Sequence, residues 1–357
     1  MPRGFRSIFL LPVLLMSASS HAGDEGRRVY ENRLTLLENP EPILADHPEF
    51  FEPVIEVTRY EAPMLVRDEG ANLEVRAWRF SYNARGIVEF PNRLRSDWTA
   101  VILVHPWGID DGQGWRTPEP AGVADFCTPA KNHVSHEHIE KVVNPFLAVH
   151  RGRAGFIVHS LPGPEDPIRK KLYRSLDLRI PSDEEKAEGA KLLHEKLNSF
   201  VYRGEPIPAQ IEVSEKTPVI DYFKQFPGLD SSARYNAEGF WDLPIPVVKS
   251  VDLGPHDVII YDAEGYEPLR DLLKEHGIRH VLLTGYATDM CFKATTAGYE
   301  NLSKDFNVFL VADASMATFP ANSTPRFATN ASISFASLNQ LVTQVSWVRY
   351  IDEKKTE

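Results

Sequence analysis

Short, nearly continuous apolar runs recur along the chain after residue 99. Four of them predict strands, at residues 100–104, 155–158, 281–285 and 308–312. Runs that are apolar on both faces are typical of parallel strands covered by helices on either side. Helical spacing of apolar residues predicts helices at 136–149, 266–273 and 335–345. Strands alternating with helices predict an α/β fold, with a doubly wound, mainly parallel sheet and helices on both faces.

The chain before these runs has a different pattern. Residues 54–95 alternate apolar and polar positions, which predicts half-exposed antiparallel strands. Residues 161–234 interrupt the alternation of strands and helices with a charged helix at about 182–200 and Pro-rich connectors. We therefore expect an N-terminal arm and small β region over 23–95. An α/β domain follows over 96–350, with an inserted helical segment at about 161–234.

The first 22 residues have the pattern of a secretory signal peptide. Arg3 and Arg6 precede a short apolar run, and Ser20-His-Ala22 fits a small-x-small cleavage site. The run is too short for a bilayer, which needs about 20 apolar residues, although an amphipathic anchor is the alternative. We expect cleavage after Ala22, a secreted or periplasmic protein, and no membrane contact afterwards.

The composition and net charge of the chain limit the kinds of molecule that it can bind. Apolar residues make up 43% of the 357 residues, enough for a core, and the net charge of −11 comes without a basic cluster. Because nucleic-acid binding depends on Lys and Arg against phosphates, no nucleic-acid partner is expected. The two cysteines, Cys127 and Cys291, are too few for a disulfide framework.

The segment around Cys291 carries the chemistry. The strand at 281–285 ends at Gly285, and Thr288 or Asp289 can cap a following helix, which places Cys291 in its first turn. Ligands bind at the carboxyl edge of open parallel sheets, and a helix N-terminus favours a thiolate. A buried structural cysteine is the alternative interpretation.

This segment resembles the isochorismatase-like cysteine hydrolases, which include nicotinamidases and N-carbamoyl amidohydrolases. The motif is Gly285-Tyr-Ala-Thr-Asp-Met-Cys291, then Ala294-Thr-Thr-Ala297 and Val311-Ala-Asp-Ala314. The resemblance covers about 97–160 and 245–346. It implies that Cys291 is the nucleophile and that a cis peptide joins Tyr286 to Ala287. The N–H groups of Ala287 and Cys291 would form the oxyanion hole.

The resemblance also implies a catalytic lysine, for which Lys249 fits, 42 positions before the cysteine. The family's aspartate after the first strand is missing, because His105 stands in its place. A histidine can activate a cysteine as an ion pair, and Asp110 or Asp111 on the loop is an alternative carboxylate. Trp107, Asp110 and Trp115 are candidate pocket residues.

These residues predict an exported cysteine hydrolase that cleaves a C–N bond of a small amide or carbamoyl compound. The alternative is a catalytically impaired protein of this fold that binds a small ligand or a protein partner. No cofactor is expected. No metal is expected either, because the stretch after the second strand, from His159 to Gly163, lacks an Asp-x-His pattern. The resemblance alone suggests a homo-oligomer.

Overall fold

The structure is a computed structural model of the chain. It describes residues 27–55, 57–81, 83, 86–106, 129–199, 209–225, 250–288, 291–317 and 344–351. The expected signal peptide lies outside the described residues, as does Cys127. Among the described residues, no helix has the length and apolar character needed to span a bilayer.

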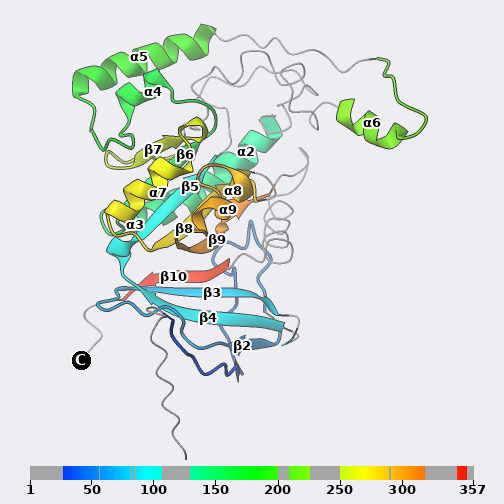
Figure 1. The fold of residues 1–357 in the computed structure, drawn as a ribbon, viewed down its shortest axis with the longest axis vertical. Helices are drawn as coiled ribbons and strands as arrows, with labels where there is room; N and C mark the ends of the chain where they lie inside the picture. Colours follow the sequence, from blue (N-terminus) through cyan, green and yellow to red (C-terminus); the bar gives the residue numbers. More distant parts are fainter. Residues whose placement is uncertain are drawn as a thin grey trace, which may run out of the picture.

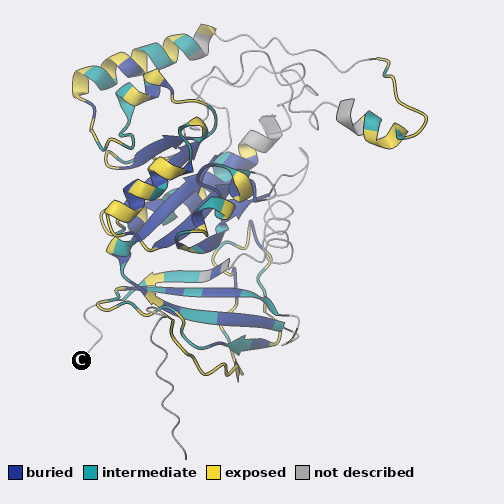
Figure 2. Ribbon diagram, viewed as in Figure 1, coloured by how far each residue is buried: buried dark blue, intermediate teal, exposed yellow. Residues whose placement is uncertain are grey.

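Five parallel strands form the centre of the molecule (Figure 1). They are β5 (Thr99–Val104), β6 (Phe156–Leu161), β7 (Val258–Tyr261), β8 (His280–Tyr286) and β9 (Asn307–Met316). Their order in the sheet is β9-β8-β5-β6-β7. Strands β5, β6 and β8 are buried along their whole lengths, which explains why their sequences are apolar on both faces (Figure 2). The α/β fold expected from the apolar runs is confirmed.

The strand order creates one point at which the chain reverses the direction in which it adds strands to the sheet. From β5 the chain builds outward through β6 and β7, and it then returns to the other side of β5 to form β8 and β9. Open α/β sheets bind ligands at such a switch point, beyond the carboxyl ends of the strands. The switch point here lies between the carboxyl ends of β5 and β8.

The helices follow the predicted apolar spacing. A continuous helical run consists of α2 (Pro129–His138), a π-helical turn η2 (Ile139–Val143) and α3 (Asn144–His150). Helix α7 (Tyr266–Glu275) buries its apolar face, as its i, i+3, i+7 spacing requires. Two short helices follow β8, namely α8 (Cys291–Ala294) and α9 (Tyr299–Leu302), and short 3-10 turns lie at η1 (Ser96–Trp98) and η4 (Asp262–Glu264).

The N-terminal β region extends the same sheet. Strands β1 (Thr35–Leu36), β2 (Arg59–Glu61), β3 (Leu73–Ser81) and β4 (Gly86–Leu94) lie beyond β10 (Gln344–Tyr350). Strand β10 pairs antiparallel with β3 and parallel with β9, so it joins the two parts into one ten-stranded sheet among the described residues. Figure 1 shows β10, β3, β4 and β2 below the parallel strands.

Three details differ from the sequence-based expectation. Val345 lies in β10 rather than at the end of a helix, because its apolar side chain is buried in the strand that connects the two parts. Strand β7, with only four residues, was not predicted. Of the strands predicted over 54–95, the first begins only at Arg59.

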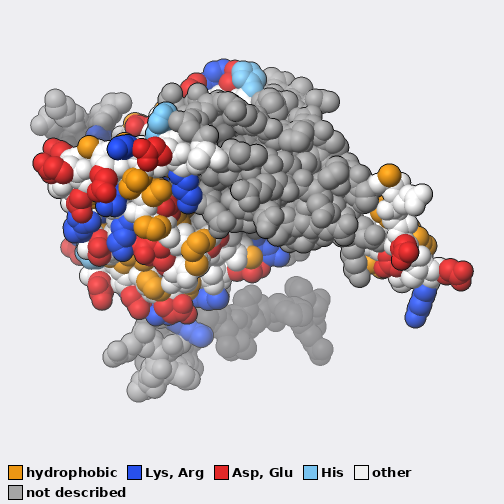
Figure 3. All heavy atoms as spheres, turned by 90° about the horizontal axis from the view of Figure 1, so that it is seen from above, with side chains coloured by type: hydrophobic (Ala, Val, Ile, Leu, Met, Phe, Trp, Pro, Cys, Tyr) orange, Lys and Arg blue, Asp and Glu red, His pale blue; other side chains and the backbone are white. Residues whose placement is uncertain are grey.

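The expected insertion contains α4 (Pro167–Leu172), α5 (Asp183–Ser199) and α6 (Pro218–Gln225). Asp166 caps α4 by accepting a bond from the N–H of Ile168, 2.9 Å away. Arg174 follows α4, and its carbonyl accepts from the N–H of Ile259 in β7 over 2.9 Å. This segment therefore covers the outer edge of β7. In Figure 3 acidic and basic side chains are interspersed over the described part of this end of the molecule.

Candidate active site

His105 and Cys291 meet at the switch point of the sheet. His105 directly follows β5, and its N–H donates to the carbonyl of Ser160 in β6 over 3.0 Å. Cys291 begins α8, five residues after the end of β8. The two residues are far apart in sequence, and the adjacent parallel strands β5 and β8 bring their ends together.

The imidazole of His105 is buried and interacts with two acidic groups. It is 1% exposed, and its Nε2 lies 3.2 Å from Oδ2 of Asp262. Burial alone would lower the pKa of His105, but the side chains of Asp262 and Cys291 outweigh it and raise the pKa to about 9. At neutral pH the ring is therefore a cation placed between a carboxylate and the cysteine sulfur.

The backbone of His105 is in an unusual conformation. Its φ is +38°, in the left-handed region that residues with a side chain seldom adopt. Such a conformation costs on the order of 1–3 kcal/mol and is found most often at functional sites. The buried position and the two acidic neighbours of the ring explain why this conformation is tolerated here.

The loop between β8 and α8 presents the cysteine. The peptide bond between Tyr286 and Ala287 is cis, at the position that the family resemblance implies. The N–H of Thr288 donates to the carbonyl of Met316 over 3.0 Å, and that of Phe292 donates to the carbonyl of Ala287 over 3.1 Å. These bonds fix the loop on both sides of the half-buried Cys291.

The helix that begins at Cys291 is shorter than expected. Helix α8 has four residues, because the chain turns after Ala294 and starts α9 at Tyr299. A helix of one turn has few aligned peptide dipoles. His105 is the cationic side chain whose interaction with Cys291 the described structure shows.

Asp262 is the residue of this site that the sequence analysis missed. It follows β7, whose short apolar run Val258-Ile-Ile-Tyr261 is the signal that could have placed it at the carboxyl edge of the sheet. The Thr296 hydroxyl donates to the carbonyl of Asp262 over 2.7 Å. The loop carboxylates considered from the sequence, Asp110 and Asp111, lie outside the described residues.

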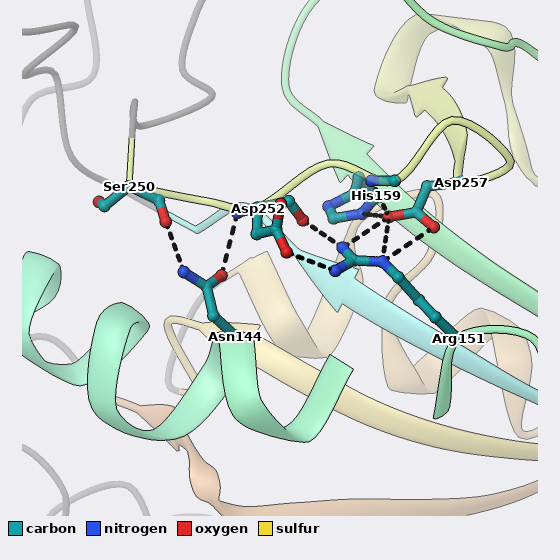
Figure 4. Close-up of polar contacts among 7 residues, drawn as sticks. Asn144, Arg151, His159, Ser250, Asp252 and Asp257 are labelled. Atoms are coloured by element: carbon teal, nitrogen blue, oxygen red, sulfur yellow. Dashed lines mark hydrogen bonds and ion pairs between the residues drawn. The ribbon is translucent and has the colours of Figure 1, made fainter. Parts of the chain in front are cut away.

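The candidate lysine, Lys249, also lies outside the described residues, but the chain directly after it is held firmly. Figure 4 shows Asn144 of α3 contacting this segment twice. Its amide nitrogen donates to the carbonyl of Ser250 over 2.6 Å, and its amide oxygen accepts from the N–H of Asp252 over 3.0 Å. One side chain thus fixes residues 250–252 to the helix.

A charged cluster completes this attachment (Figure 4). Arg151 lies 2.7 Å from the carboxylate of Asp252 and 2.9 Å from that of Asp257. His159, in β6, also contacts Asp257, with 2.9 Å between Nε2 and Oδ2. Burial would raise the pKa of Asp257, yet the bonds from His159 and Arg151 hold it well below its usual range. His159 therefore has a structural partner here.

The candidate pocket residues cannot be placed at this site. Trp107, Asp110 and Trp115 lie outside the described residues. In the part of the chain that the structure describes, no three His, Cys, Asp or Glu side chains gather as they would around a metal ion.

Comparison with known proteins agrees with the topology. The isochorismatase domain family matches residues 255–343, which include β7, α7, β8, Cys291 and β9. Residues 255–343 thus carry an isochorismatase domain, the family that the motif around Cys291 resembles. The strand that precedes His105 lies before the matched region. No curated protein matches the chain.

Several solved structures are similar at low identity. A cysteine hydrolase from Pseudomonas syringae pv. phaseolicola has 12% identity and a TM-score of 0.33, covering 69% of this chain and 87% of its own. A pyrazinamidase/nicotinamidase from Streptococcus mutans has 14% identity and a TM-score of 0.31, covering 69% and 99%. A nicotinamidase from Staphylococcus aureus has 12% identity and a TM-score of 0.29, covering 70% and 98%. At these TM-scores, the assignment rests on the domain match and the strand order.

Proposed function

We propose that this protein is an exported cysteine hydrolase that cleaves a C–N bond of a small amide or carbamoyl compound through a thioester on Cys291. The observation that carries the proposal is the interaction of Cys291 with the buried, charged ring of His105. A cation beside a cysteine at the switch point of an α/β sheet favours the thiolate where a ligand would bind.

In the first step the Cys291 thiolate attacks the carbonyl carbon of the substrate. The N–H groups of Ala287 and Cys291 stabilise the oxyanion that forms. When the C–N bond breaks, the His105 imidazolium gives its proton to the leaving nitrogen. His105 is then neutral and takes a proton from the water whose oxygen attacks the thioester carbonyl. When the C–S bond breaks, the acid product leaves and the thiolate–imidazolium pair is restored.

His105 does the work that an aspartate does in the related hydrolases. A carboxylate accepts the cysteine proton but leaves a neutral group, whereas an imidazole becomes a cation that stays close to the thiolate. By resemblance Lys249 adds positive charge. From their place on the loop after the first strand, Trp107, Asp110 and Trp115 are proposed to contact the substrate. Cleavage of the signal peptide after Ala22 would place the enzyme outside the cytoplasm. The resemblance alone suggests that it forms a homo-oligomer.

The test begins with the thiol itself, because it needs no known substrate. In the mature protein, the rate at which iodoacetamide alkylates Cys291 should follow an apparent pKa well below the ~8.5 of a free thiol. Cys127 serves as the internal comparison in the same mass spectra. A set of small amides and carbamoyl compounds is then assayed, and the Cys291→Ala variant should fold but lose all turnover.

Two results would refute this proposal. Normal titration of Cys291 would mean that the site is not activated, and turnover retained by Cys291→Ala would exclude the thioester. Ligand binding that is unaffected by Cys291→Ala, without turnover of any amide, would instead identify a binding protein of this fold.

A further inference from the structure

We propose that Asp262 is a positioning residue that orients His105 and keeps it protonated beside Cys291, so that the site works as a Cys–His–Asp group. This inference rests on the proposed function. It adds a third residue, from the end of β7, to the two that follow β5 and β8.

The geometry supports this role. Oδ2 of Asp262 lies 3.2 Å from Nε2 of His105, and the carboxylate is 27% exposed while the ring is 1% exposed. The carboxylate is therefore more accessible to solvent than the ring, and it lies at the edge of the sheet where β7 ends. An ionised carboxylate at this distance fixes the ring orientation and favours the imidazolium.

Asp262 is itself held by the segment that carries the nucleophile. Besides the hydroxyl bond described above, the N–H of Thr296 lies 3.4 Å from Oδ1 of Asp262. The N–H of Gly265 donates to the Asp262 carbonyl over 3.2 Å. Thr296 is five residues after Cys291, so one short stretch of chain fixes the thiol and the carboxylate relative to each other.

The negative charge at this site comes from a different strand end than in the related hydrolases. Where the related hydrolases have an aspartate after the first strand, this chain has His105, and the negative charge comes from Asp262 instead. Among the described residues, Asp262 and Cys291 are the titratable side chains that act on the His105 ring. The carboxylate stabilises the imidazolium, because it lies 3.2 Å from Nε2 of the ring.

The experiment compares wild type, Asp262→Asn and Asp262→Glu. The His105 ring is titrated by NMR, with its signal assigned from its loss in His105→Gln, and alkylation of Cys291 by iodoacetamide is followed across the same pH range. We expect the ring of the wild type to titrate near pH 9. In Asp262→Asn the midpoint should fall by about one unit or more, a tenfold change in the ratio of charged to neutral ring at a given pH, and the pH profile of alkylation should shift with it. Asp262→Glu should recover part of both effects.

Asp305→Asn is the matched control. Asp305, which follows α9, is also a carboxylate that bonds to side chains, namely Tyr266 and Lys274, but the His105 ring is not among its partners. This variant should leave both titrations unchanged. An unchanged His105 midpoint in Asp262→Asn would overturn the inference.

The wild-type measurement separates the two proposals. If the Cys291 thiol of the wild type is activated but indifferent to Asp262, only the role of Asp262 fails. If Cys291 titrates as a free thiol, the proposed function fails. Should Asp262→Asn not fold, the wild-type midpoint decides, because a ring that titrates at or below 6.5 is mostly neutral at pH 7 and is not kept protonated by Asp262.

Discussion

The Tyr286 hydroxyl and Nδ1 of His138 are 2.7 Å apart in the core, and Tyr286 is the first residue of the cis peptide bond. The second ring nitrogen, Nε2, lies 2.7 Å from the carbonyl oxygen of Asp313. A carbonyl only accepts, so Nε2 carries the proton, Nδ1 accepts, and the Tyr286 hydroxyl donates. Phe50, from the N-terminal β region, packs its ring edge-on against His138 with 5.2 Å between centroids. The N-terminal region thus supports the loop that presents Cys291.

Replacing Tyr286 with Phe should destabilise the protein by about 1–3 kcal/mol. The change leaves Nδ1 of His138 buried without a donor, and an unsatisfied buried acceptor has a cost of that size. Chemical denaturation at pH 7 measures it. Tyr266→Phe is the control, because its hydroxyl bonds to Asp305 near the surface, where water can replace it. Equal losses in the two variants would contradict the prediction.

His138 should make the protein sensitive to acid. Burial lowers its pKa to about 4 in the folded state, whereas an unfolded histidine titrates near 6.5. Unfolding therefore takes up a proton between these values, so this contribution is complete above pH 6.5 and is lost as the pH falls toward 4. His138→Gln can make the same two bonds without titrating, and should reduce the fall in unfolding free energy between pH 7 and pH 5.

The control for this measurement is His133→Gln, since the His133 side chain is 75% exposed. Its stability profile should match that of the wild type. A profile of His138→Gln that falls as steeply as the wild type would show that this ring does not bear the acid sensitivity.

The N-terminal β region depends on a buried ion pair. Arg59 and Glu89 are 1% and 3% exposed and lie 3.1 Å apart, and Arg76 also contacts Glu89. Glu89→Gln should cost about 3–5 kcal/mol, because it leaves a buried guanidinium uncompensated. Glu61→Gln, which breaks the more exposed pair with Arg76, should cost less than about 1 kcal/mol. Urea unfolding of the two variants decides, and similar midpoints would contradict the prediction.

The apolar runs predicted the central sheet well because its strands are buried on both faces. In β5 and β8 every residue is buried, and burial on both sides leaves a continuous apolar signal. Strand β7 was missed although its apolar run is as long as the one predicted at 155–158, and Asp262 was missed with it. Strand β10 was predicted as helix because its apolar residues continue a helical spacing from residue 335, whereas pairing with β3 decides its conformation.

The candidate site was predictable only where local sequence determines it. The stretch from Gly285 to Cys291 is contiguous, so the position of the cysteine and of the cis bond could be expected. The contact between His105 and Asp262 joins the ends of β5 and β7, which are separated by 157 residues of sequence number and one intervening strand. Such a contact follows from strand order, which the apolar pattern does not contain.

Gly285 should not tolerate a side chain. Its φ is +111°, and a Cβ there would lie 2.1 Å from the carbonyl oxygen of Val104, the residue before His105. Gly285→Ala must therefore push β5 and β8 apart at the switch point, and we expect a loss of more than about 3 kcal/mol together with slower alkylation of Cys291.

Comparison with Gly277→Ala separates the steric cost of the Gly285→Ala change from its conformational cost. Gly277 also has a positive φ, +75°, but nothing lies within 4 Å of a Cβ built on it. Its replacement carries only the conformational cost of a left-handed residue, about 1–2 kcal/mol, and should leave the reactivity of Cys291 unchanged. If both variants lose the same stability and keep the same alkylation rate, close contact between Gly285 and Val104 does not set the distance between His105 and the nucleophile.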